Sequence, residues 1–180
     1  MPFRRLVLAA LLSLAPLCWA GAGDPVVKGT LRTTFLLGGN CLTVAAVESE
    51  RRPGARLEMQ PCRDAPEQLF EWNVISFEIR NGGLCVDAFH VSPGGARAGD
   101  AVGLWYCNET HRQKWYPARK NERWFDAFNI VSGSPDGALC VSIADPDRVV
   151  GAPLNVAACN GGDQQWFRFQ TRPPLEGPAS

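Results

Sequence analysis

Cysteine is the residue type that dominates the possible chemistry of this 180-residue chain. Cys18 falls in an apolar leader, and the other six recur as pairs separated by 21, 22 and 19 residues: Cys41 and Cys62, Cys85 and Cys107, and Cys140 and Cys159. A zinc site is a poor alternative, because no two cysteines have the Cys-x-x-Cys spacing and the chain has only two histidines. Six cysteines allow about 15 connectivities. The repeated spacing selects three disulfides within the pairs, with no metal and no cofactor.

The cysteine pairs belong to a threefold repeat. In each copy, apolar residues stand one and three positions after the first cysteine, and five and three positions before the second. Each copy ends in a glutamine followed two residues later by an aromatic residue: Gln68 and Phe70, Gln113 and Trp115, Gln164 and Trp166. Apolar residues two apart between glycine-rich turns indicate half-buried strands. Because such copies bury their apolar faces against one another, the pattern predicts an all-β domain with one disulfide in each repeat.

The aromatic residues of these three triplets are predicted to lie in the core, with the adjacent glutamines bonded to backbone groups. Upstream of the cysteines, Phe77 and Ile79 match Phe128 and Ile130 in the next copy. This match predicts a further strand in each of those two copies.

The first 22 residues have the pattern of a secretory signal peptide. Arg4 and Arg5 precede an apolar run that is too short to cross a bilayer, which takes about 20 residues. We therefore expect residues 1–22 to be a signal peptide, residues 23–172 a single domain without a membrane span, and the proline-rich residues 173–180 a disordered tail. Secretion to the extracellular space or the periplasm would favour the three disulfides.

Charge and motifs exclude several classes of function. The 18 basic and 18 acidic residues give a formal net charge of zero, whereas nucleic acids and acidic membranes require clustered Lys and Arg. The chain has no Gly-x-Ser-x-Gly, His-Glu-x-x-His or phosphate-binding loop motif. We expect a protein that is not an enzyme and that does not bind nucleic acid.

One tryptophan stands on the wrong face of its strand for a core residue. Val102 and Leu104 occupy the buried positions shared by the three copies, so Trp105 projects to the opposite face. The other copies place Gln60 and Ala157 there. An exposed indole is costly without a partner, and its flat face suits the C–H face of a sugar ring. The alternative is that it covers the loop of residues 90–96.

The three copies together resemble the ricin B-type lectin domain, the family with Gln-x-Trp repeats. The resemblance covers about residues 27–170 and implies a β-trefoil, a fold of twelve strands with pseudo-threefold symmetry. In such lectins, the residue two positions after the first cysteine is an aspartate that accepts hydrogen bonds from neighbouring sugar hydroxyls. An aromatic platform stands two positions before the closing cysteine.

Only the second copy keeps both of these residues. Asp87 is its carboxylate, where the other copies have Thr43 and Ser142, and Trp105 is its platform. Further sugar-binding candidates from the same copy are Asn108, Gln113 and His90.

Two residues of the second copy depart from the family pattern. Gly103 stands where many members have a glutamine that reaches the sugar, and Arg112 stands where an asparagine often precedes the signature glutamine. The resemblance implies a secreted carbohydrate-binding lectin with one site, in the second repeat, for galactose-type glycans. The alternative is a degenerate β-trefoil that serves as a protein-interaction or toxin-assembly subunit with a partner protein.

Overall fold

The structure, a computed structural model, describes residues 26–33, 39–45, 52–63, 65–89, 95–118, 129–133 and 139–171, with the backbone alone at residues 32–33. The predicted signal peptide, His90, Phe128 and the predicted tail lie outside these ranges.

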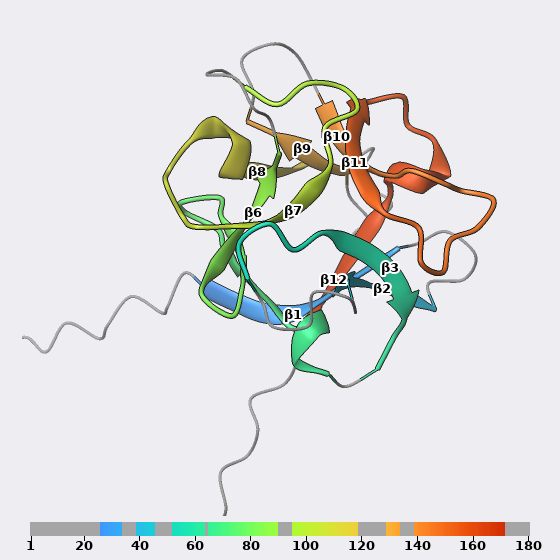
Figure 1. The fold of residues 1–180 in the computed structure, drawn as a ribbon, viewed down its shortest axis with the longest axis horizontal. Helices are drawn as coiled ribbons and strands as arrows, with labels where there is room; N and C mark the ends of the chain where they lie inside the picture. The colour runs from blue at the N-terminus through green and yellow to red at the C-terminus, as the bar shows by residue number, and fades with distance from the viewer. Residues whose placement is uncertain are drawn as a thin grey trace, which may run out of the picture.

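The described residues form twelve strands, four in each repeat (Figure 1). The strands of the first repeat are β1 (Val26–Thr33), β2 (Asn40–Val44), β3 (Leu57–Pro61) and β4 (Phe70–Asn73). Those of the second are β5 (Ile79–Asn81), β6 (Leu84–Ala88), β7 (Val102–Trp105) and β8 (Trp115–Ala118). Those of the third are β9 (Asn129–Ser132), β10 (Leu139–Ile143), β11 (Leu154–Ala158) and β12 (Phe167–Thr171). Within the described ranges, the helical elements are single 3-10 turns before the last strand of each repeat: η3 (Pro66–Gln68), η4 (His111–Gln113) and η5 (Asp163–Gln165).

Each repeat contributes one antiparallel hairpin, formed by β2 and β3, β6 and β7, or β10 and β11. Strand β1 pairs with β2, β4 and β12, so it joins the first repeat to the last strand of the third. The three hairpins surround a common centre in Figure 1, where β3, β7 and β11 contact one another. The predicted all-β trefoil architecture with three repeats is therefore confirmed.

The predicted disulfides are also confirmed. The structure contains Cys41–Cys62, Cys85–Cys107 and Cys140–Cys159, with Cα–Cα distances of 4.9, 5.1 and 5.0 Å. Each bond closes a loop of about 20 residues around one hairpin, which should contribute on the order of 3 kcal/mol to stability.

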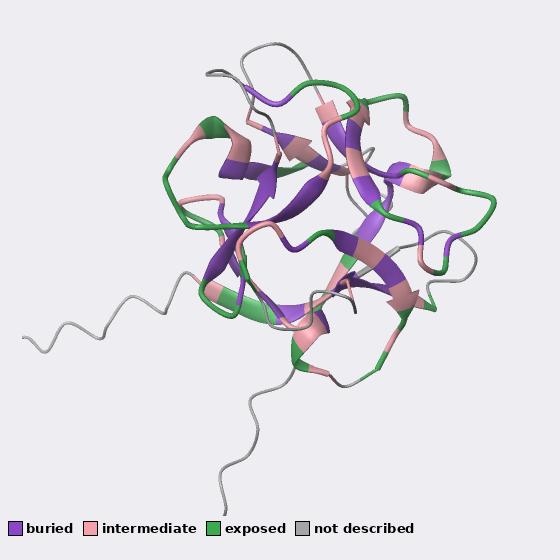
Figure 2. Ribbon diagram, in the orientation of Figure 1, coloured by how far each residue is buried: buried purple, intermediate pink, exposed green. Residues whose placement is uncertain are grey.

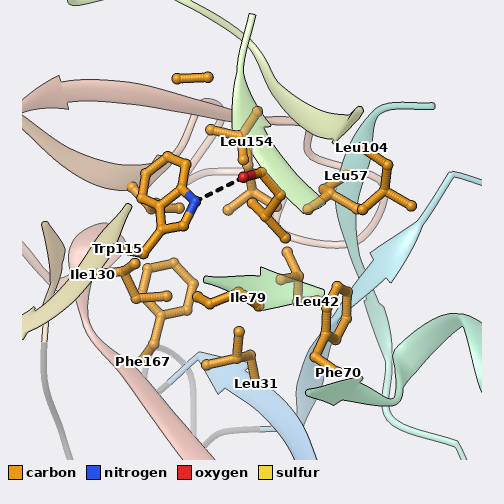
Figure 3. Close-up of a cluster of buried hydrophobic side chains, with 14 of the residues drawn as sticks. Leu31, Leu42, Leu57, Phe70, Ile79, Leu104, Trp115, Ile130, Leu154 and Phe167 are labelled. Carbon is orange, nitrogen blue, oxygen red and sulfur yellow. Dashed lines mark hydrogen bonds between the residues drawn. The ribbon is translucent and has the colours of Figure 1, made fainter. Parts of the chain in front are cut away.

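The core lies between the three hairpins and the remaining strands. Its residues are among those coloured purple, for buried, in Figure 2. Phe70, Trp115 and Phe167, one aromatic residue from each repeat, are fully buried there. The indole nitrogen of Trp115 donates a 2.8 Å hydrogen bond to the carbonyl of Val86, shown as the dashed line in Figure 3. This bond satisfies the polar atom of the indole in an apolar interior.

The structure corrects the frame of the third repeat by one residue. The core aromatic is Phe167, and the buried glutamine is Gln165, not the predicted Trp166 and Gln164. Gln165 donates to the carbonyl of Ala158 (2.9 Å) and accepts from the backbone N–H of Asn160 (3.0 Å). The same glutamine lies six residues after the closing cysteine in every repeat, a spacing that identifies it in the sequence. Trp166 is also buried, with its indole nitrogen donating to the carbonyl of Gly161.

The prediction that glutamines serve backbone groups is confirmed in the first two repeats as well. Gln68 donates to the carbonyl of Pro61 and accepts from the N–H of Arg63. The further strands predicted around Ile79 and Ile130 are confirmed as β5 and β9, but Phe77 precedes β5 and does not extend it. Its φ of 59° lies in the left-handed region, which a strand cannot accommodate, and its ring packs on Tyr116.

Backbone hydrogen bonds between repeats hold the three hairpins together. In each repeat, a glycine with positive φ donates its N–H to a backbone carbonyl in a hairpin strand of a neighbouring repeat. The three bonds are Gly54 to Leu104 (2.8 Å), Gly99 to Val156 (2.8 Å) and Gly151 to Met59 (2.7 Å). The recipient residues donate in return to Ala55, Asp100 and Ala152. Positive φ suits glycine and strains other residues, which explains its presence at all three positions. These contacts place side chains of one repeat beside the hairpin of the next.

The two glutamines of the third repeat provide a matched test of its corrected frame. Gln165→Ala should lower the free energy of unfolding by about 1–3 kcal/mol, because it leaves buried backbone groups without partners. Gln164→Ala should change it by about 0.5 kcal/mol or less, because that side chain is only partly buried. Chemical denaturation of both variants measures the difference. A larger loss in Gln164→Ala would restore the frame predicted from the sequence.

Candidate functional site

The outward face of the β6–β7 hairpin carries the two residues on which the predicted site depends. Val86 and Leu104 are buried in the core, so the alternate residues Asp87 and Trp105 face away from it. In the register, Asp87 is opposite Gly103, and Trp105, two residues further along β7, is opposite Cys85. Trp105 is 42% exposed, as its strand parity predicts, whereas Asp87 is only 3% exposed.

Gln113 holds the carboxylate of Asp87 in place. Its Nε2 donates to Oδ2 of Asp87 (2.7 Å) and to the carbonyl of Tyr106 (2.9 Å), while its Oε1 accepts from the N–H of Asn108 (2.8 Å). Gln113 is fully buried, so in this structure its side chain contacts Asp87 and backbone groups and is not exposed to solvent.

The first repeat shows the same arrangement with different chemistry. Gln68 there donates to the hydroxyl of Thr43 at 2.8 Å. That hydroxyl donates in turn to the carbonyl of Cys41. The scaffold is therefore common to both repeats, but only the second repeat places a carboxylate on it.

Burial raises the pKa of Asp87 above its ordinary value. The hydrogen bond from Gln113 and the positive charge of Arg112 act in the opposite direction, because both favour the ionised carboxylate. Arg112 thus has a defined electrostatic role beside the site, although it departs from the family pattern. The carboxylate is therefore a buried charge that its neighbours compensate only in part.

Two further aromatic rings form a corner with Trp105. The ring of Phe89 lies edge-on to that of Trp105 at a centroid distance of 6.2 Å, and Tyr106 does so at 6.1 Å. Phe89 was not predicted from the sequence as a site residue. Its position two residues after Asp87 on the same strand parity is the signal that could have identified it.

Phe89 also explains the glycine at position 103. A Cβ atom on Gly103 would lie 2.3 Å from the ring of Phe89 and 2.4 Å from the carbonyl oxygen of Ala55, so no side chain fits there. The ring of Phe89 therefore fills the space that a side chain at position 103 would need.

The remaining predicted site residues are placed differently. Asn108 is exposed beside the hairpin, but its Oδ1 accepts hydrogen bonds from the N–H (3.2 Å) and the hydroxyl (2.7 Å) of Thr110. This local turn engages the side-chain oxygen that a ligand would otherwise use. His90 lies outside the described residues, so its predicted role stays a prediction.

Among the described residues, the corresponding faces of the other two hairpins have no aromatic side chain at the position of Trp105. Gln60 in the first repeat donates to Glu58 at 2.7 Å, and the third repeat has Ala157 beside Asn155.

In the described part of the chain, no three His, Cys, Asp or Glu residues group as metal ligands. Across the same residues, no helix has the length and apolar character to span a membrane.

Comparisons with known proteins identify the fold. Neither protein-family models nor curated proteins match the sequence. ThreeFoil, a designed threefold-symmetric protein, matches with a TM-score of 0.64, 16% identity and coverage of 79% of this chain and 96% of that one.

Two natural lectins match as well. The β-trefoil lectin of the Vibrio vulnificus hemolysin/cytolysin, solved with N-acetyl-D-lactosamine bound, has a TM-score of 0.61 at 14% identity, over 82% of this chain and 96% of that one. The C-half of an earthworm R-type lectin in complex with GalNAc has a TM-score of 0.60 at 16% identity, over 81% and 99%. The chain is therefore a β-trefoil, and its resemblance to ricin B-type lectin domains is confirmed at the level of the fold.

The buried carboxylate predicts how stability depends on pH. The raised pKa of Asp87 means that the folded protein binds a proton there more readily than the unfolded chain. This contribution to stability is complete below the unfolded pKa and is lost as the pH rises through the folded pKa. At pH 7 the ionised group is therefore a net cost.

Asp87→Asn should raise the Tm at pH 7 by about 2 °C or more, since the amide keeps an acceptor for Gln113 without the charge. The gain should shrink toward pH 3, where Asp87 is protonated in the parent. Calorimetry across this pH range measures it, with the exposed Asp147→Asn as the control. A Tm gain that does not change with pH would show that the charge is not its cause.

Proposed function

We propose that this chain is a secreted carbohydrate-binding protein with one sugar site, on the outward face of the β6–β7 hairpin. One observation supports it above the others: the carboxylate of Asp87 and the exposed ring of Trp105 share that face. Among the described residues, the outward face of the β2–β3 hairpin has Glu58 without an aromatic ring, and that of the β10–β11 hairpin has neither group. Of the known functions of ricin B-type lectin domains, sugar binding requires these two groups together.

Each group has a distinct part in binding. The ionised carboxylate of Asp87 accepts hydrogen bonds from two neighbouring sugar hydroxyls, while Gln113 keeps it oriented. Trp105 supplies the surface on which the apolar face of the ring stacks. Phe89 meets that surface nearly at a right angle, with an interplanar angle of 75°, and closes one side of the site. Binding needs no bond to be made or broken, which fits a binding protein and not an enzyme.

Galactose-type glycans are the favoured ligands. The two natural lectins with this fold were solved with N-acetyl-D-lactosamine and with GalNAc, and both of these ligands contain a galactose-type ring. The three disulfides support secretion, since such bonds persist in oxidising compartments. Affinity for a monosaccharide should be modest, because a Kd near 1 mM corresponds to only about −4 kcal/mol.

A second candidate is a protein-interaction subunit. The turn between β4 and β5 exposes two apolar side chains, Val74 at 52% and Ile75 at 72%. The side chain of Asn73 accepts hydrogen bonds from the N–H groups of Ile75 and Ser76, so the turn presents these residues in an ordered conformation. Exposed apolar residues on an ordered turn suit contact with another protein.

The sugar site is tested by NMR titration with methyl β-galactoside. Asp87→Ala and Trp105→Ala should each abolish measurable binding, because one removes the charged acceptor and the other the stacking surface. Thr43→Ala and Ser142→Ala are matched controls at the equivalent positions of the other repeats, and they should bind like the parent with one sugar per chain. Circular dichroism checks that every variant folds.

A stoichiometry near three, or parent-like binding by Asp87→Ala, would contradict the single site. Absence of binding to any glycan on an array would instead favour the interaction subunit. A double Val74→Ser, Ile75→Ser variant would then test the exposed turn.

A further inference from the structure

The residue that follows Trp105 in the chain is a second exposed aromatic residue. Strand β7 ends at Trp105, and Tyr106 comes directly after it with 64% of its surface exposed. The two rings lie edge to face, with their centroids 6.1 Å apart and an interplanar angle of 73°. Together they offer a ligand a larger apolar surface than Trp105 alone.

The other repeats show that the fold does not require an aromatic residue at the position of Tyr106. The residue before the closing cysteine is Pro61 in the first repeat and Ala158 in the third, and both are exposed. The second repeat therefore differs from the other two by a pair of adjacent aromatic residues. This pair lies on the same hairpin as Asp87.

The backbone of Tyr106 is held on both sides. Its carbonyl accepts a 2.9 Å hydrogen bond from Nε2 of Gln113, and the next residue, Cys107, is bonded to Cys85. The same Nε2 donates to Oδ2 of Asp87 at 2.7 Å, so one buried nitrogen holds the carboxylate next to the backbone of Tyr106. A surface that is already held in place loses less conformational freedom when it binds a ligand.

The ring of Phe89 limits the direction in which a bound glycan can extend. It fills the space over Gly103, which precedes Trp105 by two residues on β7. Tyr106 lies at the other end of the strand, directly after Trp105. A sugar ring stacked on Trp105 is therefore bounded on the side of Phe89, and a second sugar linked to it would extend over Tyr106.

We propose that the site binds a glycan of at least two sugars. A galactose-type ring at the non-reducing end binds to Asp87 and Trp105, and the next ring contacts Tyr106 in a second subsite. The proposal rests on the proposed function, because it concerns the ligand of the same site. The tyrosine ring packs on the C–H groups of the second sugar, and this contact should increase affinity about two- to tenfold over that for the monosaccharide.

The test is an NMR titration that compares methyl β-galactoside with disaccharides that have galactose at the non-reducing end. Methyl β-lactoside, N-acetyllactosamine and lacto-N-biose differ in the second sugar or in the linkage, so they present the second ring in different orientations. The parent should bind at least one of them more tightly than methyl β-galactoside. Tyr106→Ala should remove this preference, and Tyr106→Phe should keep it because the ring remains.

Tyr116→Ala is the matched control. It removes the other tyrosine of the chain, which is 38% exposed on β8 and packs on Phe77. This variant should keep the preference of the parent for the disaccharide. Circular dichroism checks that all three variants fold.

The outcomes separate this proposal from the one on which it rests. No preference for any disaccharide in the parent, or a preference that persists in Tyr106→Ala, overturns the second subsite, while Asp87-dependent binding of methyl β-galactoside sustains the lectin function. Loss of methyl β-galactoside binding in Tyr106→Ala, or loss of the preference in Tyr116→Ala, also overturns it. Binding of no sugar by the parent overturns both proposals.

A preference lost in Tyr106→Ala and kept in Tyr116→Ala supports the second subsite. Tyr106→Phe then shows which part of the side chain is responsible. A preference that this variant keeps assigns the contact to the ring, and one that it loses assigns the contact to the hydroxyl.

Discussion

The fold depends on one contact that occurs three times: a glycine with positive φ donates its N–H to a hairpin strand of the neighbouring repeat. A single hairpin of four or five residues per strand buries too little apolar surface to be stable alone. These backbone bonds hold each hairpin against the next, and the shared core then excludes water from all three. The same contacts bring Gly54 and Arg56 of the first repeat beside Trp105 and Gly103 of the second.

The proposed site is formed where this symmetric scaffold carries an asymmetric set of side chains. A buried glutamine reaches the same point in the first two repeats, and it meets the hydroxyl of Thr43 in one and the carboxylate of Asp87 in the other. The hydroxyl is a neutral and fully satisfied partner. The carboxylate is a charge taken out of water, and the rise in its pKa shows that Gln113 and Arg112 do not offset the whole cost of its burial.

Packing around the site also accounts for its departures from the family pattern. Phe89 lies over Gly103, so the loss of a polar side chain at that position is coupled to the gain of an aromatic wall beside Trp105. This exchange makes the candidate site more apolar on the side that faces Phe89.

The sequence by itself determined the all-β class, the three repeats, the cysteine pairing and the outward face of Trp105, because period-two burial and repeated spacing are local properties of the chain. The prediction misplaced the third glutamine by one residue, because it followed the spacing to the aromatic residue, whereas the spacing of six residues from the closing cysteine selects Gln165, the buried one. Only the tertiary structure placed Phe89 over Gly103 and Arg56 opposite it. Those contacts join residues of different strands or repeats, and their register is set by backbone hydrogen bonds that leave no periodic signal in the sequence.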